Sequence, residues 1–179
     1  MPQPSSPQQK QQQQGRRRRP QSRYGVGLQE KQSLKKIFGL RDEQLKKYYN
    51  KALKVKGQTG QTLITLLERR LDNAIFRAGF AQTRPQARQM TTHRLFAVNG
   101  KPVDVPSYSL KVGDKVSVRK SKQAKSYFSN FDKRMQNHES PSWILTNPEE
   151  FGFTVTTYPT YEEANIGIDV RVVVEFFAR

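Results

Sequence analysis

The segment TRPQARQMTTHRLFAVNG, residues 83–100, decides the fold because it joins the start of a helix to a tight hairpin. Thr83 and Gln86 stand three residues apart and fit the two ends of a capping box, so they predict a helix that begins at Thr83. Asn99 and Gly100 both accept positive φ and form a strong signal for a two-residue hairpin turn. The segment therefore predicts a short helix that leads into a small antiparallel sheet.

Basic side chains lie along both parts of this segment. Arg84 and Arg88 are four residues apart, so they share one face of the helix, beside backbone N–H groups that favour phosphate. We expect Arg94, Asn99 and Lys101 to line the opposite wall of a groove. The pattern predicts a groove that follows a phosphate backbone, and the alternative is a small fold with incidental surface arginines. The predicted contacts are Thr83, Arg84, Arg88, His93, Arg94, Asn99 and Lys101.

An amphipathic helix is predicted over RDEQLKKYYNKALKVKG, residues 41–57. Leu45, Tyr48, Tyr49 and Ala52 follow helical spacing and predict its buried face. On another face, three lysines follow the same spacing without acidic partners, and we expect them to contact phosphates; the alternative is a solvated surface. These lysines are Lys47, Lys51 and Lys54.

The next stretch, TLITLLERRLDNAIFRAG at residues 62–79, carries the strongest apolar stripe in the chain. It predicts one continuous core helix that Gly79 ends, with Thr59 as a candidate cap before it. Arg69, Arg70 and Arg77 flank the stripe, and we expect them to reach outward.

Signals beyond the hairpin are weaker. Gly113-Asp114 marks a turn before a short strand over residues 115–118. A short helix is expected to end before Pro141, and Trp143 is expected in the core. The apolar run VVVEFF, residues 172–177, predicts a buried strand that docks back on the domain.

The distribution of charge points to a polyanionic partner. The chain has 179 residues and a formal net charge of +17. Residues 1–57 contribute 15 Lys or Arg against 3 acidic residues, residues 58–125 contribute 13 against 4, and residues 126–179 contribute 4 against 8. Nucleic acid should therefore meet the first two thirds, whereas the last third should face solvent, protein or the core. No cysteine is present and no apolar run approaches the roughly 20 residues that span a bilayer, which disfavours thiolate metal sites and membranes.

Residues 1–22 are rich in Gln, Pro and Ser and predict a disordered basic arm that orders on RNA. Four consecutive arginines, Arg16, Arg17, Arg18 and Arg19, are its predicted contacts. A tail that only increases solubility is the alternative. A mitochondrial presequence would need an apolar helical face, which this stretch does not have.

Residues 70–118 resemble the small RNA-binding module first described in the fourth protein of the small ribosomal subunit. The matching features, in order, are Arg70-Leu71-Asp72, Arg77, Gly79, Thr83-Arg84, Ala87-Arg88-Gln89, His93, Val98-Asn99-Gly100-Lys101, Pro106-Ser107-Tyr108 and Gly113-Asp114. The resemblance implies an α+β fold with two helices packed on a small antiparallel sheet. It adds Arg70 and Gln89 to the predicted RNA contacts.

The flanks resemble the same ribosomal protein family, from about Tyr24 to Arg179, in its bacterial or organellar form. The resemblance implies an arm at 1–22, a mainly helical domain at 23–69, the inserted module at 70–125 and a segment at 126–179 that returns to the first domain. Family members often carry a longer N-terminal segment, sometimes with zinc-binding cysteines. The short arm of this chain has no cysteine, so zinc is excluded and the RNA contacts of that segment are in doubt.

The implied role is structural, with no catalysis and no cofactor. It comprises binding to a helix junction in the 5′ domain of small-subunit rRNA, nucleation of the subunit body, and support of decoding accuracy. Implied partners are that rRNA, two neighbouring small-subunit proteins where mRNA enters the subunit, and mRNA itself. The implied location is a cytoplasmic ribosome in bacteria or an organellar ribosome.

Three other classes of protein compete with this interpretation. The module also occurs in RNA-modifying enzymes and tRNA synthetases, but those need a separate catalytic domain, and no nucleophile–base pair stands out here. A non-ribosomal factor, for ribosome rescue or RNA modification, would carry the module without the helices of residues 24–73. A membrane-surface protein would need a basic helix with an exposed apolar face, which is not evident.

Overall fold

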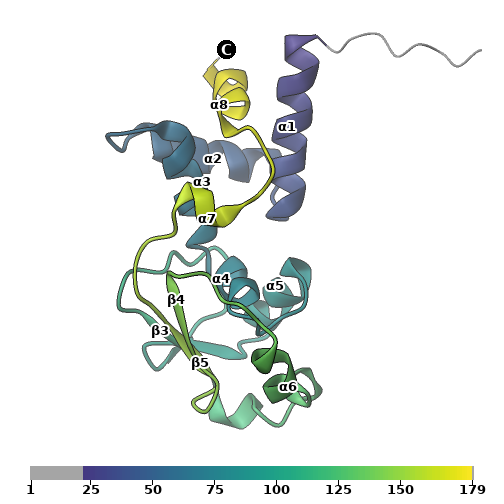
Figure 1. The fold of residues 1–179 in the computed structure, drawn as a ribbon, viewed down its shortest axis with the longest axis vertical. Coiled ribbons are helices and arrows are strands. Elements are labelled where there is room, and N and C mark those ends of the chain that lie inside the picture. The colour runs from purple at the N-terminus through teal and green to yellow at the C-terminus, as the bar shows by residue number, and fades with distance from the viewer. Residues whose placement is uncertain (1–21, 179) are drawn as a thin grey trace, which may run out of the picture.

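A computed structural model describes residues 22–178, which form two stacked bodies (Figure 1). The α-helices are α1 (Arg23–Ile37), α2 (Asp42–Leu53), α3 (Thr59–Glu68), α4 (Leu71–Arg77), α5 (Arg84–Thr92), α6 (Phe131–Gln136), α7 (Tyr161–Ala164) and α8 (Val170–Ala178). The strands are β1 (Phe96–Val98), β2 (Lys101–Pro102), β3 (Lys115–Val118), β4 (Ile144–Asn147) and β5 (Gly152–Val155), and two 3-10 turns lie at Lys120–Lys122 and Ser126–Phe128.

The first body contains α1, α2, α3, α7 and α8. Helix α1 packs along α8, and α2 packs on α3 (Figure 1). Its core includes the fully buried side chains Leu34, Leu45, Leu63, Leu67 and Val173. Each such burial stabilises the fold by about 1.5–3 kcal/mol. Within residues 22–178, every helix is too short or too polar to cross a membrane.

The second body is a five-stranded antiparallel sheet packed against α4, α5 and α6 (Figure 1). The strand order is β2-β1-β3-β5-β4. Aromatic rings fill the core between sheet and helices, with Phe80 lying 4.7 Å from Phe131 and 5.8 Å from Phe96 between ring centroids. Trp143 is buried there, as the sequence predicted. The α+β fold, with a helical domain and a module of helices on a small sheet, is confirmed.

The helix start and the hairpin turn predicted from residues 83–100 are confirmed, but the capping box is only half formed. Thr83 is the N-cap of α5, and its hydroxyl accepts a hydrogen bond from the Gln86 backbone at 3.3 Å. The amide oxygen of Gln86 accepts from the Gln82 backbone, one residue earlier than a capping box requires. Asn99 and Gly100 have φ of 49° and 78°, as a type I′ turn between β1 and β2 demands.

Residues 62–79 do not form one helix, so that prediction is wrong. The helix breaks at Arg69 and Arg70, where the Arg70 backbone is extended with ψ of 139°. The reason is a short β-type pairing with the loop that precedes β3: Leu71 N donates to Tyr108 O, and Leu110 N donates to Arg69 O, both at 2.9 Å. The proposed cap also differs, because Gln58 precedes α3 and Thr59 is its first residue.

The predicted strand at residues 172–177 is also wrong, because this stretch belongs to helix α8. Val170 and Val173 are buried, and Val174 and Phe177 pack at the edge of the same core, which is the spacing of one helical face. Arg171 lies on the exposed side. Packing against α1 and α3 thus overrides the strand preference of a valine-rich run.

The C-terminal segment 126–179 divides between the two bodies. Strand β5 pairs with β3, and β4 pairs with β5, so residues 144–155 complete the sheet of the second body. Only α7 and α8 return to the first body, where they contact α3 and α1. The return to the first domain that we expected of the whole segment therefore applies to its last part.

Candidate nucleic-acid interface

A buried polar cluster connects the two bodies. Glu68, at the end of α3, is 1% exposed and accepts two hydrogen bonds from Arg77, from Nε at 2.9 Å and from Nη2 at 2.8 Å. Asn73 Nδ2 donates to the same carboxylate at 2.8 Å. Arg77 Nη2 also donates to Ala164 O of α7 at 2.6 Å. We call Glu68, Asn73, Arg77 and Arg84 the Glu68 cluster.

Arg84 enters this cluster from the first turn of α5. Its Nε donates to Asn73 Oδ1 at 2.8 Å, and its Nη2 lies 4.0 Å from the Glu68 carboxylate. The guanidinium lies 4.5 Å from the ring centroid of Phe76 and 5.2 Å from that of Phe38. Its side chain is only 21% exposed, and this burial lowers the pKa of Arg84. Arg84 therefore ties the module to the C-terminal end of α1 and has little free surface for a ligand.

Arg70 does not reach outward, so that expectation is wrong. The residue is 3% exposed, and its guanidinium binds Asp72 in a bidentate manner, through Nε at 3.0 Å and Nη2 at 2.6 Å. Its Nη1 donates to the Tyr48 hydroxyl at 3.0 Å. All these partners belong to the protein, so the side chain is not available to RNA in this conformation.

The cleft that contains Arg84 and Arg88 has a different second wall from the one we expected. It has a volume of about 240 Å³ and lies against residues 36–39, the turn after α1, together with Asp72 and Asn73. Arg88 Nη1 donates to Gly39 O of this turn at 3.2 Å. The two bodies themselves therefore form the cleft.

The residues expected on the opposite wall lie elsewhere. Arg94 pairs with Asp104, its Nη2 lying 2.6 Å from the carboxylate. The Asn99 side chain bonds to Asp114 and accepts from the Lys115 backbone, which holds the hairpin against β3. Lys101 is exposed on β2. Thr83, Gln89 and His93 lie exposed on or beside α5, so they are accessible to a ligand.

The lysines of α2 form a basic surface on the first body. Lys47, Lys51 and Lys54 are exposed, and none has a described carboxylate within 4.0 Å. The same holds for Lys46 and Lys56, which the helical spacing did not select and which a simple count of lysines would have found. We call these five residues the α2 lysine surface. Arg16, Arg17, Arg18 and Arg19 lie outside the described residues.

Comparison with known proteins decides the family. The family model described as "S4 domain" matches residues 69–116, and "Ribosomal protein S4/S9 N-terminal domain" matches residues 4–68. Small ribosomal subunit protein uS4 of Roseiflexus castenholzii is 40% identical over 164 residues, which are 90% of this chain and 80% of that protein. The chain belongs to the uS4 family.

Two further uS4 proteins show the same extent of similarity. That of Herpetosiphon aurantiacus is 41% identical over 164 residues, 90% of this chain and 78% of its own length. That of Sulfurihydrogenibium is 43% identical over 159 residues, 88% of this chain and 78% of its own length. The family resemblance is thus confirmed, and because uS4 proteins are structural, so is the prediction that the chain is not an enzyme.

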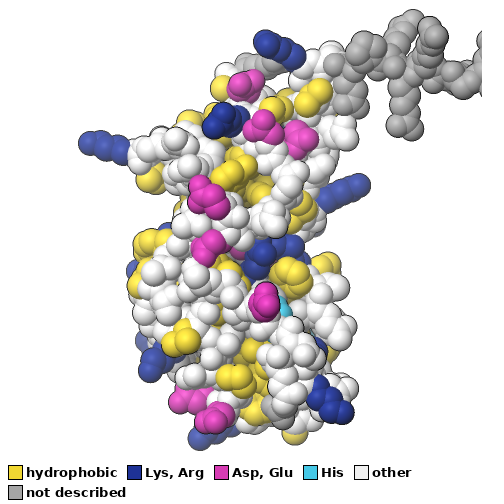
Figure 2. All heavy atoms as spheres, viewed as in Figure 1, with side chains coloured by type: hydrophobic (Ala, Val, Ile, Leu, Met, Phe, Trp, Pro, Cys, Tyr) yellow, Lys and Arg dark blue, Asp and Glu magenta, His cyan; other side chains and the backbone are white. Residues whose placement is uncertain are grey.

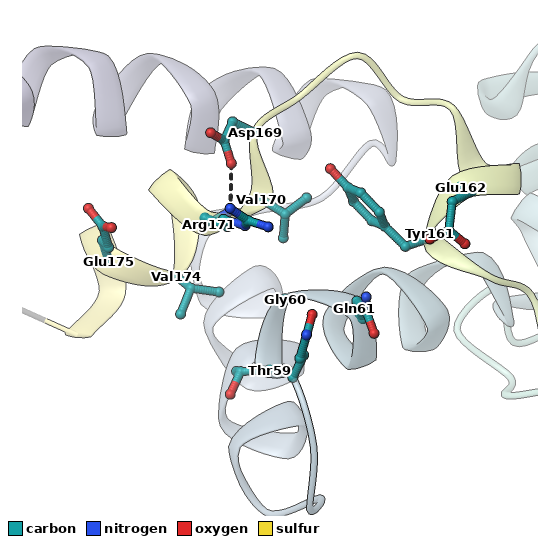
Figure 3. A pocket seen from close by; sticks show the side chains of 11 residues that line it. Thr59, Gly60, Gln61, Tyr161, Glu162, Asp169, Val170, Arg171, Val174 and Glu175 are labelled. Carbon is teal, nitrogen blue, oxygen red and sulfur yellow. Dashed lines mark hydrogen bonds between the residues drawn. The ribbon is translucent and has the colours of Figure 1, made fainter.

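The uS4 chain also has an acidic side. Figure 2 shows the face over α7 and α8, where acidic side chains gather and Lys and Arg project mainly from the margins. A cleft of about 740 Å³ lies there between the start of α3 and α8, lined by Glu162, Asp169 and Glu175 with a single arginine, Arg171 (Figure 3). Carboxylates repel phosphates, so this face does not suit RNA. Among residues 22–178, no three His, Asp or Glu side chains are grouped to hold a metal ion.

Proposed function

We propose that this protein is a structural constituent of the small ribosomal subunit that binds the 5′ domain of its rRNA and nucleates assembly of the subunit body. Membership of the uS4 family and the presence of an S4 domain support the ribosomal role. The finer role includes neighbouring small-subunit proteins and mRNA near the channel where mRNA enters, and a contribution to decoding accuracy. The corresponding location is a ribosome of bacterial type, with the organellar form as the alternative.

The observation that carries the RNA-binding proposal is the α2 lysine surface. Five exposed ammonium groups without described carboxylates are a favourable surface for phosphates, whose counterions are released on binding. Arg88 and the exposed side of α5 extend the contact onto the second body. The hydrogen bonds of the Glu68 cluster join the two bodies, which favours one arrangement of the basic elements.

A rigid arrangement of cations suits recognition of RNA shape. Lysine and arginine contact phosphates and 2′-hydroxyls of A-form helices, whose deep major groove does not admit side chains. The helical domain and the module would each lie on a different RNA helix at the junction. Specificity then comes from the angle between those helices and not from reading of base edges.

The test is binding of the full chain to a fragment of the 5′ domain, with excess tRNA as competitor, over a series of salt concentrations. A variant that combines Lys47→Gln, Lys51→Gln and Lys54→Gln should bind more weakly, with the slope of log affinity against log salt reduced by about 2–3. Arg171→Gln, which removes one cation from the acidic face, should match the unaltered chain.

The outcomes separate the candidate functions. Tight binding that survives tRNA supports a primary rRNA-binding protein. If any RNA competes equally well for the protein, the non-ribosomal alternative is favoured, namely a factor that carries the same module for ribosome rescue or RNA modification. An unchanged salt slope in the triple lysine variant would show that α2 does not contact the rRNA.

A further inference from the structure

A polar hollow lies on the second body, on the side where the C-terminal segment crosses α4. It has a volume of about 1140 Å³ and is bounded by the end of α4, the turn at Gly79–Gln82, helix α6 and the end of α7. The charged and titratable groups that line it are Arg77, Lys133, Arg134, His138, Glu139 and Glu163. Lys133 and Arg134 are two of only four Lys or Arg residues after residue 125.

Two carboxylates, Glu139 and Glu163, also line the hollow and partly offset these cations. Glu163 is occupied at the start of α7, where it accepts from the Thr160 hydroxyl at 3.1 Å and from Ser142. These hydrogen bonds, that from Ser142 first, lower the pKa of Glu163. Glu139 is exposed, and no described carboxylate lies within 4.0 Å of Arg134 or Lys133.

Arg134 is a half-buried cation with an incomplete set of partners. Its Nη2 donates to Tyr127 O at 3.0 Å, but its Nε has no acceptor among the described residues. Burial lowers the pKa of Arg134. Ser140 Oγ also has no partner, and these two are the buried side-chain polar atoms without one among the described residues. Both residues line the same hollow.

Both residues can therefore offer a donor to an anion that enters the hollow. A buried donor without a partner is costly, and an anionic oxygen would accept from both the guanidinium and the serine hydroxyl. Neighbouring atoms shield Arg134 Nε and Ser140 Oγ from solvent, so the two side chains reach a bound oxygen only if they turn toward the hollow. The wall behind it is fixed, because His138 Nε2 lies 2.8 Å from Arg77 O and the imidazole packs against Gly79.

We propose that this hollow binds a backbone phosphate of the rRNA, with Arg134 and Ser140 as donors and Lys133 at the rim. The inference rests on the proposed rRNA binding and extends it to the last third of the chain, which its charge had assigned to other contacts. Both α5 and α6 of the second body would then contact RNA.

The experiment is a salt series of binding to the 5′-domain fragment with single variants of the full chain. Lys133→Gln and Arg134→Gln should each reduce the salt slope by about 0.7–0.9, the contribution of one phosphate contact. Arg134→Gln should also weaken binding about tenfold, because it removes a charge-assisted hydrogen bond from a partly buried site. Ser140→Ala should weaken binding by a smaller factor, about threefold, and leave the slope unchanged.

The matched control is Arg171→Gln, which removes the same guanidinium from the same third of the chain, but on the acidic face. Its slope should equal that of the unaltered chain. Unchanged slopes for Lys133→Gln and Arg134→Gln would overturn the phosphate site but leave the proposed function standing. Equal reductions of the slope for Lys133→Gln, Arg134→Gln and the control Arg171→Gln would have the same meaning. If circular dichroism shows that Arg134→Gln does not fold, the salt slope of Lys133→Gln tests the site instead, because Lys133 is exposed and its replacement should not disturb the fold. Failure of the unaltered chain to bind the fragment would instead refute the proposed function.

Discussion

Replacing Glu68 by glutamine tests whether the Glu68 cluster holds the two bodies together. Both carboxylate oxygens accept hydrogen bonds from N–H groups: Oε1 from Arg77 Nη2, and Oε2 from Arg77 Nε and Asn73 Nδ2. Glutamine has the same shape but carries an NH₂ group at one of these positions. In either orientation a donor would therefore face a donor, and Arg77 and Arg84 would lose their shared counter-charge.

The magnitude follows from burial. Glu68 is 1% exposed, so water cannot replace the lost acceptor. Removal of one partner from a buried ion pair costs about 3–5 kcal/mol. In a domain of this size each kcal/mol shifts the midpoint of thermal unfolding by roughly 2–4 °C, so we expect a decrease of about 10 °C.

Urea unfolding followed by circular dichroism measures this loss. The control is Glu149→Gln, an exposed carboxylate on the turn between β4 and β5, which should change the free energy of unfolding by less than about 0.5 kcal/mol. The reasoning is refuted if Glu68→Gln costs no more than this control with the same dependence on urea. Such a result would mean that the carboxylate is solvated and the two bodies are held by apolar packing alone.

Three other changes test separate parts of the fold. Gly79→Ala should cost about 1–3 kcal/mol more than Gly113→Ala, since both glycines have positive φ but only at Gly79 would a new Cβ lie 2.6 Å from a ring carbon of His138; equal midpoints of thermal unfolding would show that the imidazole moves aside. Hydrogen bonds from two lysines of α1 lower the pKa of Asp42. Asp42 therefore adds less than about 1 kcal/mol to the free energy of unfolding above the ordinary aspartate pKa, and this is lost as the pH falls through the lowered value. Asp42→Asn should remove this part of the acid dependence of unfolding. Val173→Asp should abolish the cooperative unfolding of the first body, because it puts a carboxylate at a fully buried position of α8, and a helical circular dichroism signal that stays stable would contradict the assignment of α8 to the core.

Elements set by adjacent residues could be predicted from the sequence. The N-cap Thr83 and the Asn99-Gly100 turn depend on φ and on hydrogen bonds within a few residues, so their chemistry is visible in the printed order. The break at Arg70 could not be predicted in this way. It depends on pairing with Tyr108 and Leu110, and a window over residues 62–79 contains neither of them.

Helix α8 shows how a tertiary surface decides between two local preferences. Its valines favour a strand, yet Val170, Val173, Val174 and Phe177 also fit one helical face, and the groove between α1 and α3 selects the helix. The run therefore fits both a strand and a helix. The contacts that favour the helix come from α1 and α3, which lie more than 100 positions away in the sequence and outside any local window.

The candidate interface shows the same division. Exposure of Lys47, Lys51 and Lys54 followed from their helical spacing on a face other than the apolar one, a property of the sequence alone. The role of Arg84 did not, because its aromatic partners Phe38 and Phe76 come from other helices. The hollow beside α6 gave no signal either, since the surroundings of Arg134 come from segments far apart in the sequence.

The pairing of α1 with α8 has a consequence for the order in which the chain folds during synthesis. The sheet and its helices are complete once residue 155 has emerged, so the second body can fold while translation continues. The first body must wait for α8, because Val173 fills the core beside Leu34 and Leu63. Until then the early helices expose apolar surface, which makes an unfinished chain a substrate for chaperones and proteases. A nascent chain thus folds its second body first, and the emergence of α8 then completes the first body.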